Sequence, residues 1–346
     1  MSFFRTGKLP PDFLEKLLKR IDPQDPDLVV GPRVGEDAAV IDMGDKYLVA
    51  KTDPVTFVER EIGWYCVNIN ANDVATMGAK PRWFLSTLLL PEGKTDEAFV
   101  EKIFDDINES CNNLGITLCG GHTEVTAGLD KPILVGQMLG EVSKNKLVRS
   151  DRIEVGDSVL LTQGIAIEGT AILAAEKEKI LSEKTNADII SRAKKFLVNP
   201  GISVVEAALT ASQIADVHWM HDPTEGGIAT GLWELGKVSG LGLRINGDQV
   251  IVFPETKVFC EALGLNPWGL IASGALLIVV NSEDADKVIS SLSQRNIPTV
   301  TIGQVTPPEE GLTFSLGGKV FPLVPVSYTH LRAHETSLHL VCRLLL

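Results

Sequence analysis

The stretch NANDVATMGAKP, residues 70–81, places two asparagines and an aspartate within a run of small apolar residues. Apolar residues of this segment recur at the spacing of one helix face, at Trp64, Val67, Ala71 and Val74. Because Gly78 is a stop signal, a helix is predicted over residues 61–77. Asn and Asp are poor helix formers, and an Asp in apolar surroundings needs a partner or a cation. The pattern therefore favours a functional role for Asn72 and Asp73.

Strands and helices follow one another irregularly on both sides of this helix. In the first half, strands are predicted at residues 47–51, 83–90, 116–119 and 133–142. A helix at 95–114 has Thr95 as a possible cap. In the second half, strands are predicted at 158–162, 242–245, 275–280 and 299–305, and helices at 169–177, 186–196, 204–213 and 228–239. Such a mixture favours an α+β fold.

A charged turn near residue 150 marks a domain boundary. We expect an N-terminal arm at residues 1–34, an N-terminal domain at 35–150 and a C-terminal domain at 151–326. From Ser327 the chain reads SYTHLRAHETSLHLVCRLLL and holds three of the six histidines. This segment, 327–346, has the character of a translated adapter, with a C-terminal helix as the alternative, and it is left out of the functional argument.

Acidic residues recur at turns beside Gly, Ala or Asn, where the backbone can approach a ligand closely. They are Asp37 in GEDA, Asp53 after the strand at 47–51, and Asp222 in HDPTEGG. Taken singly, Asp37 and Asp53 are more typical of turn formers than of metal ligands. Taken with Asp73, they suggest a site that needs a cation, and a magnesium-bound polyphosphate is its natural partner.

Residues 120–123 (GGHT) follow the strand predicted at 116–119. Gly120 and Gly121 suit a nest of N–H groups for an anion, with a simple tight turn as the alternative. His122 is a candidate base or phosphate ligand, or else a satisfied polar group.

The turn HDPTEGG, residues 221–227, leads into the helix predicted at 228–239. Thr224 can cap that helix, and Gly226-Gly227 would let a ligand approach its N-terminus, a frequent type of anion site. Lys8 could reach a phosphate from a mobile arm, or remain a solvated lysine.

Composition narrows the function classes. The net charge of −13 and the lack of a basic cluster disfavour nucleic acid and anionic membranes as partners. Five cysteines without a C-x-x-C spacing predict reduced thiols in a cytoplasmic protein. No apolar run is long enough to span a membrane, and neither a P-loop nor a G-x-G-x-x-G motif is present.

As an ordered set, these motifs resemble the superfamily of aminoimidazole ribonucleotide (AIR) synthetase, thiamine-monophosphate kinase, selenophosphate synthetase and the hydrogenase maturation protein HypE. The matching stretches are GEDAAV, TDPV, NANDVATMGAKP, GGHTEV, RIEVGDSVLLT, HDPTEGGIATGLWE and NPWGLIASGALLIVV. The resemblance is strongest to the HypE-like, AIR synthase-related branch. It implies a PurM-like two-domain fold and a homodimer joined by its N-terminal sheets in a barrel-like interface.

The resemblance also implies an ATP and magnesium site. Ligands of magnesium or of the phosphates would be Asp37, Asp53, Asp73 and Asp222. Residues along the nucleotide would be Asn72, Gly120, Gly121 and Thr123, with Thr224, Gly226 and Gly227 near it and Lys8 closing over it. His122 and Asp73 are the candidate catalytic residues. The expected reaction is phosphoryl transfer from ATP to an amide or phosphate oxygen, of ligase or dehydratase type, in hydrogenase maturation.

Two departures keep alternatives open. His122 stands where kinase and HypE relatives have Asp, and Glu225 stands where many HypE relatives have Arg. One alternative is a small-molecule kinase of the thiamine-monophosphate type. The other is a nucleotide-binding dimer that serves as a scaffold without turnover. For either enzyme, the acceptor is left open and is a small molecule or a protein-borne group.

Overall fold

The computed structural model describes residues 4, 9–32, 38–56, 58 and 60–325. Lys8, Asp37 and the predicted tail at 327–346 lie outside them. Contacts divide the chain into two compact units, Glu15–Leu147 and Val148–Leu346 with Met1–Leu14. Each unit is described by itself.

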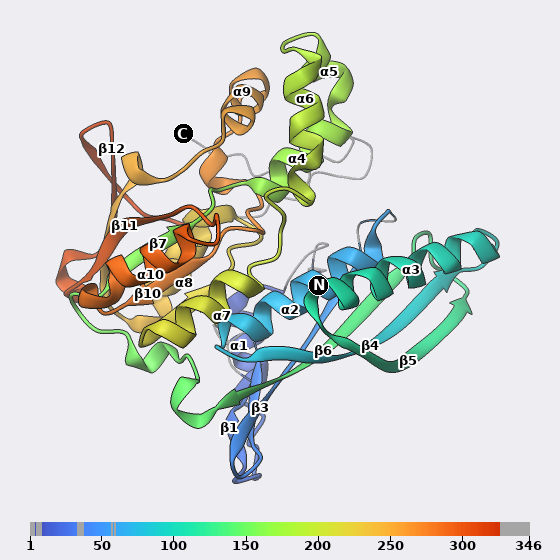
Figure 1. The fold of residues 1–346 in the computed structure, drawn as a ribbon, viewed down its shortest axis with the longest axis horizontal. Coiled ribbons are helices and arrows are strands. Elements are labelled where there is room, and N and C mark those ends of the chain that lie inside the picture. The colour runs from blue at the N-terminus through green and yellow to red at the C-terminus, as the bar shows by residue number, and fades with distance from the viewer. Residues whose placement is uncertain (1–3, 5–8, 33–37, 57, 59, 326–346) are drawn as a thin grey trace. The chain divides into compact units, whose positions relative to one another are not determined.

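The first unit is built on a six-stranded sheet in the order β1-β2-β3-β6-β4-β5, and all its neighbours are antiparallel except β4 and β5. Helix α1 (Pro11–Leu18) contains the boundary between the two units. The elements that follow in the first unit are β1 (Leu28–Val30), β2 (Ala39–Asp42), β3 (Lys46–Val55), α2 (Ile62–Thr76), β4 (Lys80–Pro91), α3 (Glu97–Leu114), β5 (Thr117–Thr126) and β6 (Ile133–Ser143). Helix α2 packs on β3, β6 and β4, and α3 packs on α2 and β5 (Figure 1).

Helix α2 contains the stretch NANDVAT and lies directly on β6. A Cβ atom at Gly136 would come within 2.4 Å of Asn70 Nδ2, and one at Gly140 within 2.4 Å of Val74 Cγ1. The two glycines are four residues apart and therefore lie on one face of β6. Asn70 and Val74 are also four residues apart and lie on one face of α2, so the two faces pack against each other. This close contact buries Asn72 and most of Asp73 and fixes α2 on the sheet.

Two local predictions in this unit are wrong. Asp96, and not Thr95, caps α3, because its side chain accepts a hydrogen bond from the Phe99 N–H at 2.8 Å. The strand expected at 116–119 extends to Thr126, so GGHT lies inside β5 and not in a turn after it. The register shifts at this point, and Gly121 passes so close to β4 that a Cβ would lie 2.0 Å from the Ser86 carbonyl oxygen.

The second unit holds a seven-stranded sheet in the order β13-β12-β9-β11-β7-β10-β8. Its strands are β7 (Ser158–Thr162), β8 (Val217–His221), β9 (Gly242–Asn246), β10 (Leu277–Val280), β11 (Thr299–Thr306), β12 (Leu312–Leu316) and β13 (Lys319–Pro322). Its helices are α4 (Ile167–Glu176), α5 (Glu178–Ser182), α6 (Ala187–Lys194), α7 (Val205–Ile214), α8 (Gly227–Ser239), α9 (Pro254–Leu263) and α10 (Ala285–Ser293). The predicted mixture of helices and sheet is confirmed.

The topology of this sheet brings three distant segments to one edge. Strand β10 is antiparallel to both β7 and β8, so β7 and β8 are parallel to each other and end on the same side. The segment before β10 begins on that side as well. Residues 163–169, 222–227 and 270–276 are therefore neighbours. Their apolar parts continue into a core that includes Leu161, Leu232 and Leu277.

Among the described residues, no helix is both long enough and apolar enough to cross a membrane.

Candidate functional site

Asp73 and Asp53 lie around one lysine in the first unit. Lys51 Nζ is 2.9 Å from Asp73 Oδ2 and 3.7 Å from Asp53 Oδ2. Residues i and i+2 of a strand point to the same face, so Lys51 and Asp53 of β3 both reach the C-terminal half of α2, which supplies Asp73. Asp53 belongs to the strand itself, which extends to Val55 and does not end before it as predicted. The lysine ammonium is the partner that the buried Asp73 needs.

Asn70 holds this group in place. Its Nδ2 donates to the Asp53 carbonyl at 3.3 Å and to the Cys66 carbonyl at 2.8 Å, which joins β3 to α2. Its Oδ1 is buried and accepts no hydrogen bond from the described residues. Burial raises the pKa of the Cys66 thiol beyond the physiological range, so Cys66 serves the packing and not nucleophilic chemistry.

The GGHT segment is far from Asp53 within one chain. The pairing registers place Asp53, Gly136, Ser86 and Gly121 in one row across β3, β6, β4 and β5. Three steps between strands of about 4.8 Å each separate Asp53 from Gly121 by roughly 14 Å. Two groups at this separation cannot ligate one metal ion.

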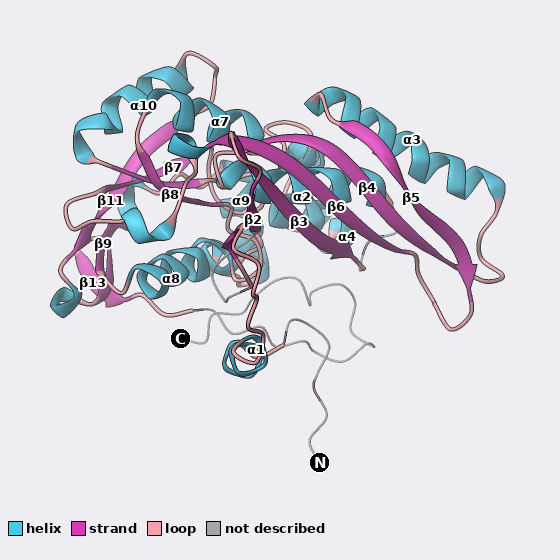
Figure 2. Ribbon diagram, turned by 90° about the horizontal axis from the view of Figure 1, so that it is seen from below, coloured by secondary structure: helices cyan, strands magenta, loops and turns pink. Residues whose placement is uncertain are grey.

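His122 and Thr123 lie on the exposed edge strand β5 (Figure 2). His122 Nε2 is 3.1 Å from Glu124 Oε2, and both side chains are about half exposed or more.

In the second unit, the HDPTEGG turn packs against the segment before β10. The Thr224 carbonyl accepts from the N–H groups of Gly227 at 3.1 Å and Ala272 at 3.3 Å. Gly227 is required by this contact, because a Cβ there would lie 2.4 Å from the Leu270 carbonyl oxygen at a φ of 61°. The predicted cap is wrong: Gly226 is the N-cap of α8, and the Thr224 hydroxyl donates to Glu225 at 2.9 Å.

Glu168 lies in the first helical turn of α4, close enough to the HDPTEGG segment for the charges of Asp222 and Glu225 to act on it. Its side chain is buried, and burial raises the pKa of its carboxyl to about 7. The Ser273 hydroxyl opposes the rise, and the negative charges of Glu225 and Asp222 add to it. Ala166, which precedes α4, has a φ of 61°, a left-handed conformation that costs a non-glycine residue energy and often marks functional segments. Glu168 and Ser273 were not predicted from the sequence.

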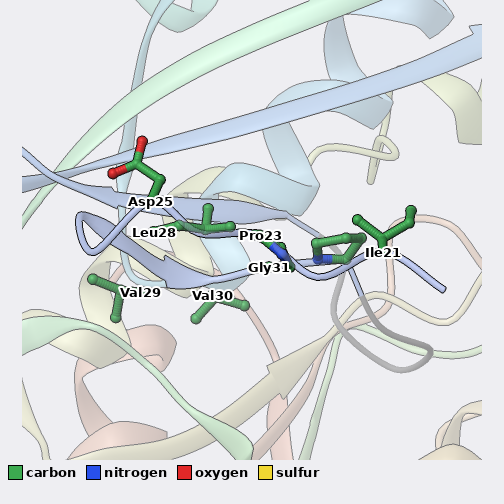
Figure 3. Close-up of a pocket in the computed structure, with 8 residues that line it drawn as sticks. Ile21, Pro23, Asp25, Leu28, Val29, Val30 and Gly31 are labelled. Carbon is green, nitrogen blue, oxygen red and sulfur yellow. The ribbon is translucent and has the colours of Figure 1, made fainter. Parts of the chain in front are cut away.

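A separate pocket of about 290 Å³ lies on residues 21–32 (Figure 3). Its lining is largely aliphatic, with Pro23, Leu28 and Val30, and Asp25 is its charged residue. None of the predicted site residues lines it.

A magnesium ion in a nucleotide site needs only one or two protein carboxylates, because phosphates and water complete its shell. Within the described part of the chain, no group of three or more His, Cys, Asp or Glu side chains is arranged to hold a metal. Asp53 and Asp73 fit the smaller requirement, since both lie close to one cationic group. Asp53 and Asp73 would bind a magnesium ion in place of the Lys51 ammonium group.

Comparison with known proteins identifies the class of fold. The chain superimposes on the crystal structure of hydrogenase maturation protein HypE in complex with ATP with a TM-score of 0.70 and 24% identity, covering 88% of this chain and 91% of the other. The two share one two-domain, PurM-like architecture.

Family descriptions match both halves. AIR synthase related protein, N-terminal domain, matches residues 35–142, and AIR synthase related protein, C-terminal domain, matches residues 154–314. The protein belongs to the AIR synthase-related family, as the resemblance predicted.

Two curated relatives cover most of the chain. A hydrogenase expression/formation protein of Methanocaldococcus jannaschii is 29% identical over 266 residues, 75% of each chain. Carbamoyl dehydratase HypE of Rhizobium leguminosarum bv. viciae is 28% identical over 267 residues, 75% of this chain and 73% of the relative.

Proposed function

We propose that the protein is a HypE-like enzyme that uses ATP and magnesium to activate an amide oxygen by phosphoryl transfer. The observation that carries the proposal is the match of both halves to one family, with curated relatives that include a carbamoyl dehydratase. The likeness in fold to a HypE structure in complex with ATP supports it. Hydrogenase maturation is the setting in which these relatives act.

The residues of the first unit would position the triphosphate. Asp53 and Asp73 would hold magnesium, and Asn72 would line the nucleotide beside them. Magnesium, when bound, neutralises charge on the transferred phosphoryl group, and catalysis of this kind consists mainly of positioning. Lys51 would then approach a phosphate oxygen, because the carboxylates of Asp53 and Asp73 would be engaged by the ion.

A homodimer would complete this site. One copy keeps Asp53 and the GGHT segment roughly 14 Å apart, whereas β5 is an exposed edge strand that a second copy could cover. In that assembly the GGHT segment of one copy would approach the Asp53–Asp73 group of the other. Gly120, Gly121, His122 and Thr123 would then contribute to the nucleotide site in trans.

The test is ADP release from ATP with magnesium and an S-carbamoyl thiol as the acceptor. We expect Asp73→Asn to abolish ADP release. Asp105→Asn on the exposed face of α3 is the matched control, and it should leave the rate unchanged. Full activity of Asp73→Asn would refute the proposed role. Binding of ATP without turnover in the wild type would support a scaffold instead.

A further inference from the structure

Asn70 is a buried amide at a position where packing would accept an apolar residue. It is fully buried in α2 and lies against Gly136 of β6. Val74, one helical turn further along the same face, makes the equivalent contact with Gly140 through a methyl group. Asn70 Oδ1 is buried and accepts no hydrogen bond from the described residues, which costs free energy. Packing alone therefore does not account for the amide.

The two N–H groups of this amide fix its orientation. Nδ2 donates to the Cys66 carbonyl at 2.8 Å and to the Asp53 carbonyl at 3.3 Å. An amide turned by half a rotation would place Oδ1 against these two carbonyl oxygens, which cannot donate to it. The Asn70 side chain is therefore a fixed brace between α2 and the backbone of β3 at Asp53.

Of the two carboxylates beside Lys51, that of Asp53 is the less constrained. The Asp73 side chain is 10% exposed, whereas that of Asp53 is 37% exposed. Among the described residues, β2 pairs with β3 as far as Ala50, and β6 continues the pairing past Asp53. The hydrogen bond from Asn70 ties the Asp53 backbone to the helix that carries Asp73.

The freedom of a carboxylate decides which cation a site prefers. Magnesium demands near-ideal octahedral geometry with oxygens at about 2.0–2.1 Å, whereas calcium accepts flexible geometries with oxygens at about 2.3–2.6 Å. A brace that holds Asp53 at a fixed separation from Asp73 favours the smaller and more demanding ion. An Asp53 without the brace would still serve calcium.

We propose that Asn70 is a positioning residue that makes the Asp53–Asp73 site selective for magnesium over calcium. The inference rests on the proposed function, because it concerns the cation of the same nucleotide site. Asn70 contacts neither the ion nor the nucleotide in this proposal, and it acts through the backbone of Asp53.

The test is calorimetric binding of a non-hydrolysable ATP analogue to the full-length protein with magnesium, with calcium or with EDTA. Asn70→Leu keeps the approximate volume of the side chain and removes both N–H donors. The gain in affinity that magnesium gives should fall about tenfold, as is usual when a partner behind a metal ligand is lost. The gain that calcium gives should fall clearly less. Val74→Ala removes packing at the neighbouring contact and is the matched control, so it should keep the wild-type gain with both ions.

Gly136→Ala tests the same brace from the other side. A Cβ at Gly136 would lie 2.4 Å from Asn70 Nδ2 and would displace the amide. This variant should also lose more of the magnesium gain than of the calcium gain, and it carries the test if circular dichroism shows that Asn70→Leu does not fold.

The outcomes separate the inference from the proposed function. Equal losses with the two ions, or unchanged gains in Asn70→Leu and Gly136→Ala, would overturn the inference while magnesium-dependent binding in the wild type upholds the proposed site. If magnesium does not strengthen binding of the analogue to the wild type, the inference and the proposed magnesium site both fail. If the wild type does not bind the analogue at all, the proposed function fails as well.

Discussion

Glu168 should make the stability of the protein depend on pH in an unusual direction. Burial raises the pKa of its carboxyl from an ordinary 4.5 to about 7 in the folded protein. The folded state therefore holds the proton more tightly than the unfolded chain does. The stability linked to this group is fully present below pH 4.5, falls as the pH rises and is lost above about pH 7.

The magnitude follows from the rise in pKa. A rise in pKa of about 2.5 units at about 1.4 kcal/mol for each unit gives about 3.5 kcal/mol in total, of which about 3 kcal/mol falls between pH 5 and pH 8.5. Glu168→Gln removes the titrating group and keeps the shape of the side chain. We expect the variant to unfold at higher urea than the wild type at pH 8 and to lose that advantage at pH 5.

The assay is urea unfolding of both proteins at several pH values from 5 to 8.5, followed by circular dichroism and by tryptophan fluorescence. Agreement of the two probes checks that unfolding is cooperative, as the extraction of a free energy requires. The free-energy difference between variant and wild type should change by about 3 kcal/mol over this range. A difference that stays constant with pH would show that Glu168 is not buried as a titrating group, and the reasoning would be refuted.

Other predictions concern the first unit. Gly121→Ala should lower the melting temperature clearly more than Gly120→Ala, because only the Cβ at 121 would meet the Ser86 carbonyl oxygen; equal losses in thermal melts would contradict the close strand contact. Lys51→Met should destabilise by about 3 kcal/mol, since it leaves the buried Asp73 without its ion pair, and adding Asp73→Asn should restore much of this; additive losses in chemical unfolding would exclude the coupling. Removal of magnesium with EDTA should weaken ATP binding at least about tenfold in calorimetry, and unchanged binding would remove the metal from the proposed site.

The sequence predicted the framework well where local pattern decides structure. The apolar spacing of Trp64, Val67, Ala71 and Val74 and the stop at Gly78 predicted a helix over 61–77, and α2 covers Ile62–Thr76. Strand β7, at Ser158–Thr162, lies where an apolar run after a charged turn predicted it. Both signals are local, so a single sequence carries them.

Long-range contacts account for what was missed. GGHT looked like a turn because glycine pairs favour turns, but Gly121 serves the close approach of β5 to β4, which the sequence does not display. Glu168 looked like an ordinary acidic residue in the first turn of a helix, and it becomes unusual only because folding buries it and brings the charges of Glu225 and Asp222 near it. The alternation of YLVAKTD does place Lys51 and Asp53 on one face, a signal that could have identified the lysine.

The contact between α2 and β6 has a consequence for how this family can diverge. Gly136 leaves space that Asn70 fills, and Gly140 leaves space that Val74 fills. A larger residue at either strand position can be accepted only together with a smaller one on the helix. Across natural relatives we therefore expect positions 136 and 70 to change together, and positions 140 and 74 to change together. Relatives in which both pairs stay fixed should be those that keep the hydrogen bond from Asn70 Nδ2 to the Asp53 carbonyl.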